Sequence, residues 1–196
     1  MSLKKIFGRK YILASKSERR KKLLKQIGLD FKVDVSNVSE EESEKGSPIN
    51  IVMKNSVLKS QSVARKYTGE IIIGADTIVL LDNRIFHKPK NLNEAKEYLR
   101  QLSGRKHKVY TGFNIIDTKY NVEIFNYEKT IVDFRKLSDD EISYYVNKYK
   151  PTDKAGAYGI QEDFGCLFIK GISGDYYNVV GMPLTKFYET LLLILK

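Results

Sequence analysis

Residues 71–81 read IIIGADTIVLL, the most apolar stretch of the chain, with one acidic side chain, Asp76, near its middle. The runs 71–73 and 78–81 predict buried strands, because β-branched residues pack well on a covered, pleated surface. A carboxylate inside such a stretch is costly to bury unless a cation, a metal ion or water reaches it. Two interpretations of Asp76 follow: a functional acid, or the polar end of a surface turn formed by residues 74–76.

The segments around this stretch alternate between strand and helix patterns. Further strands are predicted at 11–14, 31–35, 84–86, 109–116 and 122–134. Helices are predicted to begin at Ser15, Ser47, Asn93, Ser138 and Pro183. Helices and strands alternate in the first half while a long hairpin occupies the middle, which predicts an α/β protein with a mixed sheet rather than a doubly wound one. Because no change of composition marks a linker, we expect a single domain spanning residues 1–196.

The composition is ordinary for a globular protein. Hydrophobic residues make up 42% of the 196 positions and charged residues 30%, which does not indicate disorder. Lys and Arg number 34 against 24 acidic residues, and the net charge of +10 favours polyanionic partners: nucleotides, nucleic acid or an anionic membrane surface. No window approaches the roughly 18 apolar residues of a membrane-spanning helix, and residues 1–10 lack the apolar core of a signal peptide. We therefore expect no membrane partner.

The few cysteine and histidine residues argue against several kinds of site. Cys166 is the only cysteine, which excludes an internal disulfide and a multi-cysteine zinc site, and its apolar neighbours predict a buried side chain. His87 and His107 lack metal-ligand spacing with a second histidine or a cysteine, so core or surface roles are expected. Neither a Walker P-loop nor a dinucleotide-binding fingerprint is present. A phosphate site in this chain must be of another kind.

Residues 15–22 read SKSERRKK and place four consecutive cations where a short strand turns into a helix. A helix N-terminus carries about half a positive charge, so Arg19 and Arg20 are unfavourable there unless an anion lies among them. Free N–H groups, two serine hydroxyls and the two guanidiniums would together form a phosphate site. The alternative is a capping box between Ser15 and Glu18, with the basic side chains in solvent.

Further candidate residues lie in short segments at loop or helix ends. Lys59 and Lys88 are cations that, with the two arginines, can offset the charge of phosphates while Asp76 holds a divalent ion or a water. In the glycine-rich segment 153–161, the amide of Gln161 can both donate and accept a hydrogen bond, as reading a base edge requires. The alternatives are solvated lysines and a glycine-rich turn with Gln161 in solvent.

Five blocks, taken in order from Ile12 to Pro183, resemble the Maf family of nucleoside triphosphate pyrophosphatases, which are related in fold to the inosine triphosphate pyrophosphatases. The blocks are Leu13-Ala14-Ser15 through Arg19-Arg20; Gly74-Ala75-Asp76-Thr77; Lys88-Pro89 with Leu102-Ser103-Gly104, His107 and Val109-Tyr110-Thr111-Gly112; Asp153 to Gln161; and Asn178 to Pro183. The resemblance implies a single two-lobed domain, a cytoplasmic homodimer and an enzyme that depends on Mg²⁺ or Mn²⁺. Its implied reaction hydrolyses a nucleoside triphosphate between the α and β phosphorus atoms, which gives the monophosphate and pyrophosphate and clears unwanted nucleotides.

The same resemblance implies roles for individual residues. An acidic loop follows the strand predicted at 31–35 and contains Glu40, Glu41, Glu42 and Glu44. Asp76 matches the catalytic acid that accepts a proton, and it would hold the metal together with Glu41, or with Glu40 if the acidic loop aligns differently. The positions linked to the choice of dTTP and UTP are Arg19, Thr77 and Gln161. The basic positions of the phosphate site are Arg20, Lys59 and Lys88, beside the hydroxyl of Ser15.

Two departures from the family pattern and several alternatives bear on the substrate. Glu18 replaces the proline usual before the paired arginines, and residues 162–165 depart from the shorter glycine-rich pattern usual after Gln161. Within the enzyme class, the alternatives are the branch that prefers 7-methyl-GTP and a purine-selective relative of the inosine type. From another class, a non-enzymatic nucleic-acid or cell-division partner would show a continuous basic stripe interleaved with exposed aromatic residues. We expect instead cations clustered around an acid in a pocket, and no nucleic-acid partner.

Overall fold

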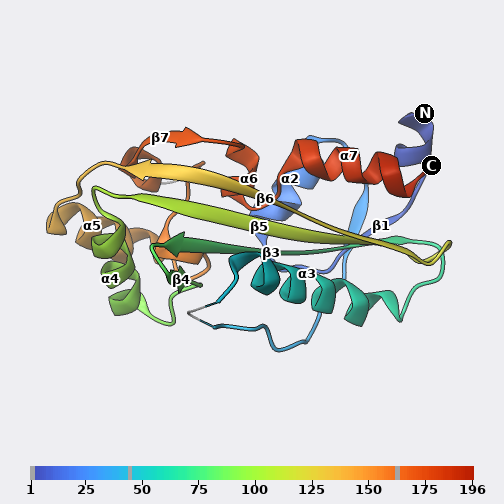
Figure 1. Cartoon of the computed structure of the whole chain (residues 1–196), viewed down its shortest axis with the longest axis horizontal. Coiled ribbons are helices and arrows are strands. Elements are labelled where there is room, and N and C mark those ends of the chain that lie inside the picture. Colours follow the sequence, from blue (N-terminus) through green and yellow to red (C-terminus); the bar gives the residue numbers. More distant parts are fainter. Residues whose placement is uncertain (1–2, 44–45, 162–163) are drawn as a thin grey trace.

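The computed structural model describes residues 3–43, 46–161 and 164–196, and these form a mixed sheet of seven strands flanked by helices (Figure 1). The strand order is β2-β1-β3-β5-β6-β7, with β4 also paired to β3. Neighbouring strands are parallel between β1 and β2 and between β1 and β3, and antiparallel elsewhere, which confirms the mixed sheet. The strands are β1 (Tyr11–Leu13), β2 (Phe31–Val33), β3 (Ile71–Leu81), β4 (Arg84–Phe86), β5 (Lys106–Asp117), β6 (Val122–Phe134) and β7 (Ile169–Ser173).

The strand β3 is continuous, so the second of the two interpretations of Asp76, a surface turn at residues 74–76, is wrong. Its residues pair with β5 from Ile71 to Leu80 without a break. Alternate side chains point to opposite faces of a strand: Ile73 packs in the cluster that includes α2 and α7, whereas Ile72 packs in a cluster with α3. Both faces are covered, which is why this strand reads as an apolar run rather than as an alternating pattern.

Helices cover both faces of the sheet. In Figure 1, α3 lies against one face of β3 and β5, and α7 lies on the opposite side, above β6. The helices α4 and α5 pack together at the far end of the sheet from the two chain termini. The helices are α1 (Leu3–Phe7), α2 (Glu18–Gln26), α3 (Pro48–Ala64), α4 (Leu92–Leu102), α5 (Asp139–Tyr149), α6 (Tyr176–Val180) and α7 (Leu184–Ile194).

The helix starts test the capping predictions one by one. Ser47 caps α3 with Pro48 in its first turn, and the capping box from Ser138 to Glu141 opens α5, both as predicted. The prediction for α4 is off by two residues, because Asn91 rather than Asn93 accepts the cap bond from the Glu94 amide.

The capping box predicted between Ser15 and Glu18 is wrong. Ser17 caps α2 by accepting a bond from the Arg20 amide, and the Glu18 carboxylate lies 2.6 Å from the Lys21 ammonium. The Ser15 hydroxyl does not cap the helix and instead accepts a hydrogen bond from the Arg20 side chain.

Several short elements were not predicted, namely α1, β7, α6 and the 3-10 turns η1 (Ala155–Ala157) and η2 (Phe164–Phe168). Cys166 lies in η2 and is exposed, so the prediction of a buried cysteine is wrong: η2 points its Phe168 inwards instead. His107 is buried, which agrees with the core role, one of the two roles expected for the histidines. Part of the departure at residues 162–165 lies outside the described residues. No helix among the described residues is long and apolar enough to cross a membrane.

A notch in the sheet leaves the middle of β3 without a strand neighbour on one edge. The strand β1 ends at Leu13, opposite Ile73, and β4 reaches β3 only from Val79 onwards. Among the described residues, no strand pairs with that edge of β3 in between. Asp76 and Thr77 lie in this interval, where β3 has no strand neighbour on that edge.

Gly74 allows α3 to lie directly on β3. A Cβ atom at this position would overlap the Ser56 carbonyl and approach the Ser60 amide nitrogen to 2.8 Å, and both groups belong to the helix backbone.

Gly74→Ala is therefore expected to lower the free energy of unfolding by about 1–3 kcal/mol, measured by urea denaturation. The control is Gly171→Ala in β7, where a Cβ meets no atom within 4 Å and the expected change is under about 0.5 kcal/mol. Equal stabilities of the two variants would contradict this account of Gly74.

Candidate active site

A cavity of about 230 Å³ opens at the notch in the sheet. The start of α2, the middle of β3, the segment after β4, the loop 153–161 and the end of α6 form its walls. The predicted site residues that line it are Arg19, Arg20, Asp76, Thr77, Lys88 and Gln161. Four segments that are distant in the sequence thus bring six of the predicted residues together, three of them cations and one the acid Asp76. Two further acids, Glu18 and Asp153, also line the cavity.

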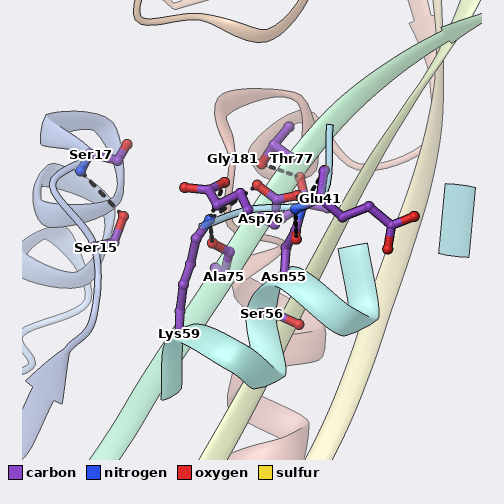
Figure 2. Close-up of polar contacts among 12 residues, drawn as sticks. Ser15, Ser17, Glu41, Asn55, Ser56, Lys59, Ala75, Asp76, Thr77 and Gly181 are labelled. Carbon is purple, nitrogen blue, oxygen red and sulfur yellow. Dashed lines mark hydrogen bonds and ion pairs between the residues drawn. The ribbon is translucent and has the colours of Figure 1, made fainter. Parts of the chain in front are cut away.

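Asp76 is held by two residues of α3. Its side chain is 9% exposed, its Oδ2 accepts a bond of 2.9 Å from Asn55 Nδ2, and its Oδ1 lies 3.2 Å from Lys59 Nζ. Figure 2 shows Asn55 and Lys59 reaching up from the helix towards Asp76 on the strand. The two residues are one helical turn apart, so they share a face of α3. The buried acid therefore has both a cationic and an amide partner, as its burial requires.

The surroundings of Asp76 keep its carboxylate ionised. Burial by itself would raise the pKa of Asp76, but the charge of Lys59, the Asn55 hydrogen bond and the charge of Arg20 outweigh it and hold that pKa below its ordinary value. An ionised carboxylate at a cavity wall can accept a proton or hold a divalent cation.

Lys59 lies behind Asp76 and joins it to a second acid. Its Nζ is 2.7 Å from a carboxylate oxygen of Glu40 and 3.3 Å from the Ala75 carbonyl oxygen. The Glu41 carboxylate pairs instead with Lys54 at 3.1 Å, where both side chains are exposed. Glu40 is thus the acid that shares a cation with Asp76, while Glu41 supports the site through its backbone, which bonds with the Asn55 amide.

Arg20 is buried and fully oriented by the protein. Its Nε donates to the Gly181 carbonyl at 3.0 Å, one terminal nitrogen donates to Ser15 Oγ at 3.1 Å, and the other to Thr77 Oγ1 at 3.0 Å. A guanidinium has five N–H donors, so these three bonds leave one N–H on each terminal nitrogen for a ligand. The predicted phosphate role of Ser15 is therefore indirect: its hydroxyl holds Arg20.

In the hydrogen bonds that lead from Arg20 through Thr77 and Thr111, each donor and each acceptor can be assigned. Thr111 Oγ1 donates its single proton to the Asn178 carbonyl, 2.9 Å away. The contact of 3.0 Å between Thr77 and Thr111 must then take its proton from Thr77. Thr77 therefore accepts from Arg20 and donates to Thr111, and its hydroxyl proton is already used inside the protein. This chain of bonds ties Arg20 to α6.

Lys88 and Gln161 face the cavity from its other walls. Burial, with the nearby charge of Arg20, lowers the pKa of the Lys88 ammonium from its ordinary value. The Oε1 atom of Gln161 is buried and has no hydrogen-bond partner among the described residues. A buried acceptor of this kind costs free energy unless a ligand supplies a donor. The predicted alternative of a solvated Gln161 is therefore wrong for this atom.

The residues present fit a divalent metal that is bound jointly with a phosphate ligand. Among the described residues, no cluster of three or more histidine, cysteine or acidic side chains could hold an ion by itself. Mg²⁺ in phosphate-transfer sites is commonly held by one or two carboxylates, substrate phosphates and waters. Asp76 lines the cavity and would be the carboxylate of such a set, and Glu40, which contacts the same lysine but does not line the cavity, would be the second.

Several residues of the site were not predicted from the sequence. Asn55 had a usable signal, since it precedes Lys59 by four residues on a predicted helix and so lies on the same face. Thr111 and Asn178 lay in segments that resembled the family, but nothing in their spacing indicated that they meet. The two residues form a hydrogen bond only because β5 and α6 are neighbours in the fold.

Comparison with known proteins places the chain in a family. The family model described as Maf-like protein matches residues 10–193. A dTTP/UTP pyrophosphatase of Dictyoglomus thermophilum is 46% identical over 92% of this chain and 93% of its own length, and one of Thermoanaerobacter is 48% identical over 93% and 95%. Among solved structures, the Ham1 protein of Staphylococcus aureus aligns with a TM-score of 0.47 at 16% identity, covering 64% of this chain and 72% of its own. The family match and these relatives show that this chain belongs to the Maf-like protein family.

Proposed function

We propose that this protein is a nucleoside triphosphate pyrophosphatase that converts dTTP and UTP to their monophosphates and pyrophosphate. The observation that carries the proposal is a single cavity in which an ionised carboxylate, Asp76, faces the cations Arg19, Arg20 and Lys88. Hydrolysis of a phosphoanhydride needs this combination, because negative charge on the phosphates must be offset while a water is oriented and deprotonated. The names of the Dictyoglomus and Thermoanaerobacter relatives support the choice of dTTP and UTP.

In the proposed mechanism, Arg20 and Lys88 bind the phosphate chain and Asp76 orients the attacking water. The water oxygen forms a bond to the α-phosphorus as its proton passes to the Asp76 carboxylate, and the bond to the bridging oxygen breaks so that pyrophosphate leaves. Lys59 stabilises the carboxylate before the proton transfer. A divalent ion such as Mg²⁺ or Mn²⁺ would be held by Asp76 and Glu40, in preference to Glu41, and would supply further charge neutralisation at the phosphates.

The base is read by Gln161 in this proposal. Uracil and thymine both carry an N3–H donor, which suits the unpartnered Oε1 atom of Gln161. In this proposal Thr77 acts on the binding of every nucleotide through the orientation of Arg20, because its hydroxyl proton is already donated to Thr111. The homodimer, the single two-lobed domain and the cytoplasmic location stay predictions.

An assay of pyrophosphate release from a nucleotide panel tests the proposal. We expect release from dTTP and UTP in the presence of Mg²⁺ or Mn²⁺, and kcat/KM values lower by at least about tenfold for 7-methyl-GTP and ITP, the nucleotides of the two alternative branches. Preference for either of those would overturn the pyrimidine choice. Release from no nucleotide, together with salt-dependent binding of oligonucleotides, would overturn the enzymatic function.

The lowered pKa of Lys88 predicts a loss of substrate binding at alkaline pH. The ammonium loses its proton below the ordinary lysine value of 10.5, so kcat/KM for dTTP is expected to fall as the pH rises through the lowered pKa of Lys88. Lys88→Arg should flatten this fall, since a guanidinium stays protonated over the whole range. The measurement is a pH profile of kcat/KM for both proteins, and identical alkaline limbs would contradict the assignment.

A further inference from the structure

Arg19 is fixed at the mouth of the cavity by one residue from across it. Its two terminal nitrogens donate to Asp153, one to the carboxylate Oδ2 at 2.6 Å and the other to the backbone carbonyl at 3.2 Å. Arg19 lies on α2 and Asp153 lies 134 positions further along the chain, in the loop that follows α5. Two bonds to one partner fix both the position and the plane of a guanidinium.

The carboxylate of Asp153 keeps its charge and its orientation. Lys154 Nζ lies 3.0 Å from its Oδ1 atom, so each carboxylate oxygen contacts a separate cation. Burial would raise the pKa of Asp153, but the Lys154 hydrogen bond and the charge of Arg19 outweigh it and lower that pKa. The acid is therefore ionised in neutral solution, and Lys154 fixes the oxygen that Arg19 does not use.

The loop that presents Asp153 is tied to the wall that carries Lys88. The Gly156 amide donates to the His87 carbonyl at 3.2 Å, and the Ala157 amide donates to the Lys154 carbonyl at 3.1 Å. His87 Nε2 in turn bonds the Ser43 carbonyl of the acidic loop at 2.9 Å. Asp153 is thus attached to the same framework as the phosphate-binding lysine, so it can hold Arg19 in a defined place relative to Lys88.

We propose that Asp153 is a positioning residue that holds Arg19 ready for the substrate, an inference that rests on the proposed function. The Asp153 contacts use two of the five N–H donors of Arg19 and leave three for a nucleotide. A long arginine side chain loses rotamer freedom when it is immobilised by a ligand, and prior fixation by the protein removes that cost from binding. Asp153 therefore strengthens substrate binding without touching the reacting atoms.

A double-mutant cycle between Arg19 and Asp153 tests this role. Asp153→Ala is expected to raise the KM for dTTP by about 5- to 10-fold with kcat changed by less than about twofold, the signature of lost uniform binding. In the Arg19→Ala background, the same substitution should have almost no further effect, because the residue it positions is gone. Asp153→Asn, which keeps an acceptor oxygen, should recover part of the lost binding. The control is Asp139→Ala, which removes an exposed acid paired with Arg100 at 2.8 Å, outside the residues that line the cavity, and it should leave KM unchanged.

The outcomes separate this inference from the proposed function. If the wild-type protein hydrolyses dTTP but Asp153→Ala leaves KM unchanged, or if the effects of the two single substitutions add in the double variant, the positioning role is overturned and the function stands. If the wild-type protein releases pyrophosphate from no nucleotide, the function is overturned together with the role of Arg19 on which this inference rests.

Discussion

Asp76→Asn is expected to abolish most turnover, with kcat for dTTP lowered by about 10²- to 10⁴-fold. The amide has nearly the size of the carboxylate but cannot accept the proton of the attacking water, and it is a poor ligand for a divalent ion. Asn55 and Lys59 both donate to the carboxylate, so the amide offers an acceptor oxygen to only one of them, and the change removes the charge together with one hydrogen bond. The measurement is kcat under saturating dTTP, with nucleotide binding followed separately by calorimetry.

The control for Asp76→Asn is a second buried acid outside the site. Asp117 is fully buried and its Oδ1 lies 2.7 Å from Arg9, away from the cavity. Burial would raise the pKa of Asp117, yet its bonds to Arg9 and to the Lys119 amide lower it, so it resembles Asp76 in its electrostatics. Asp117→Asn should lose stability but keep kcat for the folded fraction. A kcat for Asp76→Asn within a few-fold of wild type, with binding intact, would show that Asp76 is not the catalytic acid.

Both acids also predict how stability depends on pH. A carboxylate whose pKa is lowered on folding contributes stability that is present above its unfolded pKa, about 3.9, and is lost as the pH falls through its lower folded value. Asp117→Asn should therefore be less stable than wild type at pH 7, and the difference should shrink on acidification below about pH 4. Urea denaturation at several pH values measures this.

The sequence predicted the two apolar runs of β3 and the acid between them. It did not show that the two runs form one continuous strand. The apolar runs on both sides of Gly74 were correctly identified as strands. The glycine itself suggested a turn, since glycine most often marks one, whereas its actual role is to admit the backbone of α3. Which of these two roles a glycine has depends on how the preceding helix packs on the strand, so the spacing of residues alone could not decide it.

The pattern of residues 15–22 predicted the two arginines of the site as a pair, and only the family resemblance gave them different roles. Arg19 and Arg20 are neighbours in the sequence, and the pattern treated them alike. In the fold, Arg19 pairs with Asp153 at the mouth of the cavity, while Arg20 is buried against Gly181, Ser15 and Thr77. These partners lie up to 161 positions away, so the difference arises from tertiary structure and leaves no local trace.

Arg20→Lys is expected to lower kcat/KM for dTTP by about 10²- to 10³-fold, the size of effect seen when one donor to a transition-state charge is removed. A lysine has three donors on one nitrogen and cannot reach Gly181, Ser15 and Thr77 while also facing a phosphate. The matched control is Arg9→Lys, since Arg9 also makes three bonds, two to Asp117 and one to the Gly69 carbonyl, outside the residues that line the cavity. That variant should lose stability and keep kcat/KM.

A pair of substitutions at Thr111 decides whether Arg20 works through its orientation or only through its charge. Thr111→Val keeps the shape of the side chain but leaves the Thr77 proton without its acceptor and the Asn178 carbonyl without its donor. If orientation matters, kcat/KM falls for every nucleotide, by less than in Arg20→Lys, and Thr111→Ser restores it. If Thr77 read the base directly, freeing its hydroxyl would change the ratio of kcat/KM between dTTP and ITP instead. A uniform fall with recovery by serine is the expected result, because the direction of each hydrogen bond in this chain leaves Thr77 no proton to offer a base.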